Sequence, residues 1–176
     1  MKFRPLILAV LAVLSLASPV RALDFANHAF FKHLIGEWKA EGELKGTDNN
    51  LVTITETWTG KADAEGSFYI EGSRTVNGET QRFKWSITHN AAIDSYEAIL
   101  TGADDSQTLR FEGSLSEVTM VMTMKAITGT GGSGVTVEDS FADADRDTLE
   151  SKVTLTNDQG QTSLEGKITH KRVKAP

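Results

Sequence analysis

Three polar residues stand in phase with apolar side chains, where a strand is expected to have its dry face. Glu56 lies between Ile54 and Trp58, and Arg74 and His89 take equivalent positions in later apolar runs. An inward charge is costly to bury unless it is paired. We therefore expect Glu56 and Arg74 to satisfy each other or to orient the polar head of a ligand. The alternative places Arg74 and His89 at a barrel mouth, in contact with water.

The same side chains, together with Tyr96, are the candidates for acid–base chemistry. An enzyme would need a compact site, and the sequence has no Gly-x-Ser-x-Gly elbow, His-Glu-x-x-His helix or lysine-bearing phosphate loop. Binding is therefore favoured over catalysis, and we assign no catalytic residue. Whether the chain is an enzyme stays open.

Sulfur and indole side chains could form an apolar cavity wall. Met120, Met122 and Met124 alternate along one predicted strand, and thioethers adapt readily to an apolar guest. Trp58 and Trp85 share the expected inward phase. These residues are candidates to line a ligand cavity, and the alternative is that the methionines are ordinary core filling.

No metal site is predicted. Asp139, Asp143, Asp145 and Asp147 alternate, but they lack the glycine and distal glutamate of a calcium loop, which favours a solvated acidic turn. The chain has no cysteine, which excludes disulfides and thiolate metal ligands.

The elements that must position these residues are strands. Apolar and polar residues alternate between clusters of turn residues, and Asn77-Gly78 is the strongest hairpin signal. Short connections make successive strands antiparallel, and closing the first strand on the last removes both exposed edges. We predict an all-β, up-and-down barrel of about ten strands, with a two-sheet sandwich as the alternative. The expected strands are 37–45, 51–61, 66–76, 79–89, 95–102, 106–114, 117–126, 135–141, 148–156 and 162–172.

A short helix is expected before the first strand. Phe30, Phe31, Leu34 and Ile35 form one apolar stripe within residues 25–35, and Gly36 ends the pattern.

The first 22 residues have the pattern of a signal peptide. Lys2 and Arg4 precede an apolar run over 6–16, and Val20-Arg21-Ala22 is a small-x-small cleavage site. The run is shorter than the roughly 20 residues of a membrane span, so stable membrane insertion is not expected. We expect residues 23–176 to form a single domain that is periplasmic or secreted, without a lipoprotein cysteine.

The charge of the chain argues against nucleic acid as a partner. The formal net charge is −6, and only 167–174 gathers basic residues, which a solvated last strand explains.

One family resemblance covers nearly all of residues 23–176. The segment His33-Leu-Ile-Gly-Glu-Trp-Lys-Ala-Glu-Gly42, followed by Trp58, Phe68-Tyr-Ile-Glu-Gly72, Tyr96 and Phe111-Glu-Gly113, resembles an uncharacterised bacterial lipocalin-like family of the calycin superfamily. The resemblance implies a calycin-type barrel in which Gly36 and Trp38 seal one end beneath the N-terminal helix. It implies no cofactor.

A second resemblance is to the nitrobindin-like haem barrels. Gly36-Glu-Trp38-Lys-Ala40-Glu-Gly42 is similar to their Gly-x-Trp-x-Gly-x-Gly motif, with Ala40 in place of one glycine. This resemblance implies His170, on the last strand, as a haem ligand. Haem is therefore the alternative to a chain without a cofactor.

Two functions of different classes remain. The favoured one is an exported barrel that binds or carries a small apolar molecule, with Glu56, Trp58, Arg74, Trp85, His89, Tyr96, Met120, Met122 and Met124 as candidate lining residues. The other is a barrel with a filled interior that binds a partner through its surface. The ligand and the oligomeric state are not predicted.

Overall fold

The computed structural model describes residues 22–102, 108–127 and 133–174. One 3-10 turn, Phe31–His33 (η1), precedes ten strands. The strands are β1 (Gly36–Gly46), β2 (Leu51–Ala62), β3 (Ser67–Val76), β4 (Glu79–Asn90), β5 (Ser95–Thr101), β6 (Thr108–Ser116), β7 (Val121–Ala126), β8 (Gly134–Phe141), β9 (Thr148–Thr156) and β10 (Thr162–Arg172).

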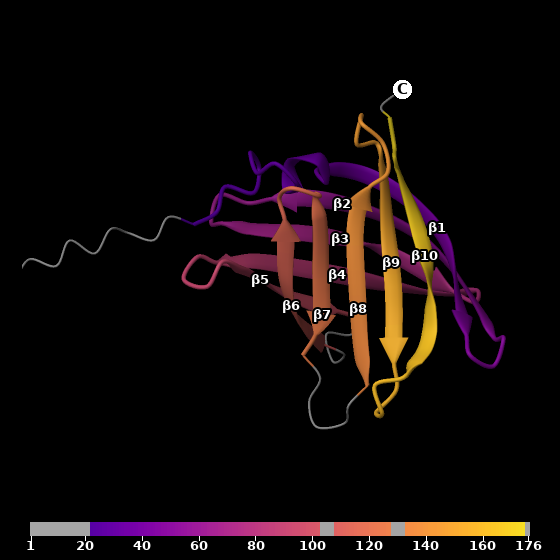
Figure 1. Ribbon diagram of the computed structural model, residues 1–176. Coiled ribbons are helices and arrows are strands. Elements are labelled where there is room, and N and C mark those ends of the chain that lie inside the picture. Colours follow the sequence, from indigo (N-terminus) through magenta and orange to yellow (C-terminus); the bar gives the residue numbers. More distant parts are fainter. Residues whose placement is uncertain (1–21, 103–107, 128–132, 175–176) are drawn as a thin grey trace, which may run out of the picture.

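The strands form a closed antiparallel barrel (Figure 1). Each strand pairs with its neighbours in sequence, and β1 pairs with β10 to complete the ring. Closure satisfies the backbone hydrogen bonds of both terminal strands. The all-β, up-and-down barrel is confirmed, and the sandwich alternative is excluded. Asn77 and Gly78 both have positive φ, as the predicted hairpin turn requires.

One predicted strand is shorter than expected. The sequence predicts a strand over 117–126, but β7 begins at Val121. Residues 117–120 form a turn in which Thr119 donates from its backbone and its hydroxyl to Ser116 Oγ, and Met120 has a φ of 54°. The turn removes Met120 from the alternation that orients Met122 and Met124.

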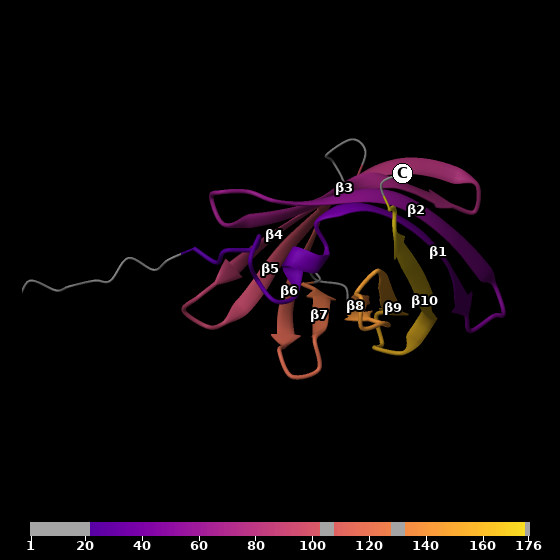
Figure 2. The ribbon, with the colours of Figure 1, turned by 90° about the horizontal axis from the view of Figure 1, so that it is seen from above.

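The N-terminal segment, residues 22–35, is less helical than the apolar stripe predicts. Among the described residues only η1 is helical, and the last carbonyl groups of the segment accept hydrogen bonds from side chains of the barrel. Trp38 Nε1 donates to Leu34 O at 3.2 Å, Arg172 Nη1 donates to Ile35 O at 2.8 Å, and Arg172 Nη2 donates to His33 O. Figure 2 shows this segment lying over one mouth of the barrel.

A glycine on β2 lets the N-terminal segment approach the wall. A Cβ atom at Gly60 would lie 2.1 Å from Leu34 O, so a larger residue would push the segment away. The segment therefore closes this end of the barrel with Phe25, Phe30 and Phe31, each 1% exposed.

The buried apolar side chains form two clusters. The larger one joins the N-terminal phenylalanines to Trp38, Trp58, Phe68 and Phe111, and the smaller one gathers around Leu44, Ile54 and Ile168 near the opposite end. The inward alternation places polar residues between the two clusters.

The predicted signal peptide lies almost wholly outside the described residues and stays a prediction. Within residues 22–102, 108–127 and 133–174, no helix is long and apolar enough to cross a membrane.

Candidate functional site

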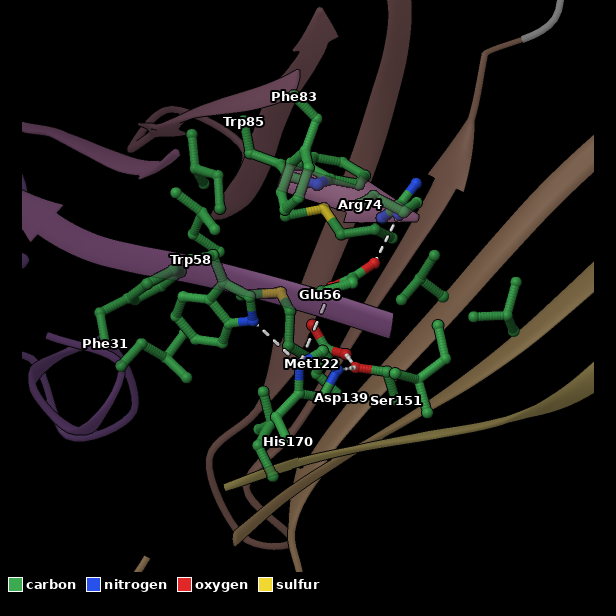
Figure 3. A pocket seen from close by; sticks show the side chains of 18 of the residues that line it. Phe31, Glu56, Trp58, Arg74, Phe83, Trp85, Met122, Asp139, Ser151 and His170 are labelled. Atoms are coloured by element: carbon green, nitrogen blue, oxygen red, sulfur yellow. Dashed lines mark hydrogen bonds and ion pairs between the residues drawn. The ribbon is translucent and has the colours of Figure 1, made fainter. Parts of the chain in front are cut away.

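A cavity lies inside the barrel below the N-terminal segment (Figure 3). Its volume is about 90 Å³, counted as space open to the centre of a water molecule. By this measure one water needs roughly 10–15 Å³, so the cavity has room for several waters or one compact molecule. Its apolar walls include Phe31, Trp58, Phe83, Trp85, Met122 and Met124.

Five polar side chains on neighbouring strands line the cavity. Arg74 on β3, Glu56 on β2, His170 on β10, Ser151 on β9 and Asp139 on β8 all line the cavity, and we call them the polar band. Each lies two residues along its strand from an apolar residue that belongs to one of the two core clusters or packs against it.

An ion pair forms one end of the polar band. Arg74 Nε donates to Glu56 Oε1 at 2.5 Å, and the Arg74 guanidinium lies 4.9 Å from the centre of the Phe83 ring. Glu56 is buried, whereas the Arg74 side chain is 25% exposed. The expectation that Glu56 and Arg74 satisfy each other is confirmed.

A small residue brings Glu56 and His170 together. Ala40 on β1 lies between them, because it is paired with Glu56 on one side and with His170 on the other. The methyl side chain leaves room, and Glu56 Oε2 lies 4.0 Å from His170 Nδ1.

The hydrogen bonds of His170 fix its tautomer. Trp58 Nε1 can only donate, and it donates to His170 Nδ1 at 3.0 Å. Burial, with a smaller effect of Arg74, lowers the pKa of His170 to about 4, so the ring is neutral at neutral pH. Its proton is therefore on Nε2, which donates to Ser151 Oγ at 2.9 Å.

Asp139 ends this chain of hydrogen bonds. Ser151 Oγ donates to Asp139 Oδ1 at 2.5 Å. Burial raises the pKa of Asp139 to about 6, an effect that Glu56 strengthens and the Ser151 hydrogen bond opposes. In a serine hydrolase the serine donates to histidine, whereas Ser151 accepts from His170 and donates to a carboxylate. The arrangement therefore does not activate Ser151 as a nucleophile.

The two shifted pKa values make opposite contributions to stability. Asp139 has a higher pKa folded than the usual value near 3.9, so the folded chain holds more protons at this carboxyl between about pH 4 and 6, and stability falls as pH rises. His170 has a lower pKa folded than the usual value near 6.5, so the unfolded chain holds more protons between about pH 4 and 6.5, and stability rises.

We expect Asp139→Asn to reveal the His170 contribution alone. Because this variant lacks the Asp139 contribution, its free energy of unfolding should rise between pH 4 and 6.5 by about 2–3 kcal/mol more than that of the unmodified chain. The free energy of unfolding of His170→Gln should instead fall over this pH range relative to that of the unmodified chain, because only the Asp139 contribution remains. Urea unfolding at half-unit pH steps measures both, and three parallel profiles would contradict the assignment.

Most of the predicted lining residues lie at the cavity. Glu56, Trp58, Arg74, Trp85, Met122 and Met124 all line it. That they bind a ligand stays a prediction. Trp38 and Gly36, the predicted seal, lie at the closed end: the Trp38 indole stacks on Trp58 with ring centres 5.2 Å apart, and Gly36 has a φ of 114°.

Three predicted lining residues lie elsewhere. Met120 is in the β6–β7 turn. His89 Nε2 lies 3.0 Å from Asp94 Oδ1 beside the β4–β5 turn. Tyr96 is buried against Phe25 and Phe31 of the N-terminal segment rather than against the cavity.

Sequence reasoning missed Asp139, Ser151 and Arg172. Asp139 was expected in a solvated turn, but it is in phase with Val137 and Phe141, and this alternation was the available signal. Arg172 lies 4.5 Å from the Trp38 ring and donates to Asp147 at 2.9 Å, in addition to its bonds to the N-terminal segment.

The cavity residues do not fit a haem group as they are arranged. His170 is buried on the last strand, but Trp58 and Ser151 engage both of its ring nitrogens. A porphyrin also exceeds the cavity volume of about 90 Å³. His170 as a haem ligand stays a prediction.

Comparison with known proteins supports the assignment of the barrel fold. No protein-family model matches the sequence, and no curated protein matches it. The barrel is similar to the S-type phycobiliprotein lyase CPES from Guillardia theta, with a TM-score of 0.63, 10% identity, and coverage of 84% of this chain and 92% of the lyase.

Two further structures have similar folds. Rv2717c from M. tuberculosis has a TM-score of 0.57 and 11% identity, with coverage of 88% of this chain and 100% of that chain. A DUF3598 family protein of unknown function from Nostoc punctiforme has a TM-score of 0.52 and 13% identity, with coverage of 81% of this chain and 48% of that chain. At these identities the likeness shows the fold alone, a closed antiparallel barrel.

Proposed function

We propose that this chain binds a small, largely apolar molecule inside the barrel, in the periplasm or after secretion. The observation that carries the proposal is a cavity with apolar walls that are interrupted by one band of polar side chains. Small-molecule sites commonly combine apolar walls with a few convergent polar groups that orient the ligand.

The polar band itself supports a binding role. A buried ion pair such as Arg74–Glu56 is seldom more stabilising than apolar side chains of similar volume, because both charges lose their hydration. A barrel built only for stability would therefore hold apolar residues at these positions. The band instead places several polar groups on the cavity wall.

The seal supports the same role. Trp38, Arg172 and the N-terminal segment close one end of the barrel without filling the space below them. We infer that Gly36 and Trp38 act as the Gly-x-Trp seal of a lipocalin-like family and that this family includes the chain.

Native mass spectrometry tests the proposal on protein purified from its own host without added cofactor. We expect a bound small molecule on the unmodified chain and its loss in Val137→Phe, because Val137 lines the cavity and the larger ring occupies it. The matched control is Ile99→Phe, since Ile99 is 37% exposed beside inward-facing Ala98 and its replacement leaves the cavity open.

Two results would contradict the proposal. One is an unmodified chain without any bound mass, which favours a filled barrel that acts through its surface. The other is a bound mass that Val137→Phe retains, which places the molecule outside the cavity. An absorbance scan of the same sample tests the haem alternative, which requires a Soret band that His170→Ala abolishes.

A further inference from the structure

The charges that face the cavity do not balance. Glu56 is paired with Arg74, which is the only lysine or arginine lining the cavity among the described residues. His170 is neutral at neutral pH because burial lowers its pKa. Asp139 therefore has no cation to offset its charge, and the ionised cavity carries an excess of one negative charge.

The Asp139 carboxylate also has a free side. Oδ1 accepts from Ser151, and no ion pair of Asp139 occurs within the described part of the chain. Every fully buried side-chain oxygen or nitrogen of the described residues has a hydrogen-bond partner. Asp139 Oδ2 has no partner, so it is not fully buried, and it is open to the cavity that Asp139 lines. Figure 3 shows Asp139 and Ser151 beside His170 on the cavity wall.

From this arrangement we propose that the ligand is a protonated amine on a compact apolar body, and that its ammonium group binds Asp139. The inference rests on the proposed function and names the chemical class of the ligand. The ammonium supplies the missing positive charge and donates to Oδ2. The apolar body contacts the aromatic wall, which includes Trp58 and Trp85.

Other ligand classes fit less well. An anion could reach the Arg74 guanidinium, but Glu56 already neutralises this group and Asp139 repels a second negative charge. A neutral alcohol could donate to Asp139 but leaves the negative charge uncompensated in a poorly hydrated space. The charge balance therefore favours the amine over both.

Three probes of one shape test the inference. Benzylamine is protonated at neutral pH, benzyl alcohol is neutral and benzoate is negative. Calorimetric titration should show benzylamine binding about tenfold or more tightly than benzyl alcohol, as expected for a hydrogen bond between charged partners. Benzoate should bind least. Equal affinities for amine and alcohol, or tightest binding of benzoate, would overturn the inference.

Replacing Asp139 tests whether its carboxylate is the charge that binds the amine. Asp139→Asn should weaken benzylamine binding about tenfold or more and leave benzyl alcohol within about twofold. The matched control is Glu138→Gln, because Glu138 precedes Asp139 on the same strand but pairs with Lys152 on the outer face. An amine preference that survives Asp139→Asn would overturn the assignment. If Asp139→Asn does not fold, the three probes on the unmodified chain still decide.

The outcomes separate this inference from the proposed function. Binding of benzyl alcohol that Val137→Phe abolishes supports the cavity whether or not the amine is preferred. A bound host molecule without an amine, lost in Val137→Phe, would sustain the proposed function and overturn the inference.

Discussion

Replacing Trp38 with alanine is expected to lower the free energy of unfolding by about 3–5 kcal/mol, as found for buried aromatic residues. Trp38 is 1% exposed, and its indole lies between the Trp58 ring and the Arg172 guanidinium. The substitution leaves a cavity beneath the N-terminal segment and removes the donor to Leu34 O. Urea denaturation at neutral pH measures the loss.

The matched variant Trp38→Phe separates packing from the hydrogen bond. It keeps a ring against Trp58 and Arg172 but cannot donate to Leu34 O, so we expect a smaller loss than for alanine. A loss below about 1 kcal/mol for Trp38→Ala would contradict the role of this residue as a seal.

Replacing Arg74 with methionine is expected to cost about 3 kcal/mol, because it leaves the Glu56 carboxylate buried without its partner. The value is at the low end for a buried pair, since the Arg74 side chain is 25% exposed. Glu56→Gln in the same chain should recover most of the loss by removing the unpaired charge. Chemical denaturation of both single variants and the double variant gives the coupling between the two residues.

An exposed ion pair provides the control for Arg74. Lys167 Nζ lies 2.8 Å from Glu150 Oε1, and the Lys167 side chain is 56% exposed. Lys167→Met should cost less than about 1 kcal/mol. Equal losses for Arg74→Met and Lys167→Met would show that the cavity ion pair is as well hydrated as a surface pair.

The barrel was predictable because most of its strands have one apolar face and one polar face. Residues alternate inward and outward along each strand, so apolar residues recur with a period of two and turn residues mark the ends. Asn77-Gly78 forms the predicted turn because both residues tolerate positive φ. The β6–β7 turn is predicted at 115–116 but lies at 117–120, because the signal that places it is in side-chain hydrogen bonds between Ser116 and Thr119 rather than in glycine or proline.

The candidate site was predictable only in part. Alternation tells which face a residue is on but not its height along the barrel axis. Glu56 and His89 share the inward phase, yet only Glu56 lies at the cavity, because His89 is at the end of β4. Tyr96 is inward as expected, but the N-terminal segment covers it, and the contacts of that segment cannot be read from a strand pattern.

The chain of hydrogen bonds from Trp58 to Asp139 was beyond sequence reasoning. It joins residues on β2, β10, β9 and β8, and β2 is brought next to β10 through β1 only when the barrel closes. Asp139 and Ser151 each stand between apolar inward residues, which is the signal that identified Glu56. Applied to every strand, that criterion finds both.

A crystal structure of the chain purified from its own host tests the central claim most directly. The account predicts density for a compact molecule in the cavity, in contact with Trp58 and within hydrogen-bonding distance of Asp139 or Arg74. An interior filled by the chain's own side chains, or a cavity that holds only ordered water, would contradict it.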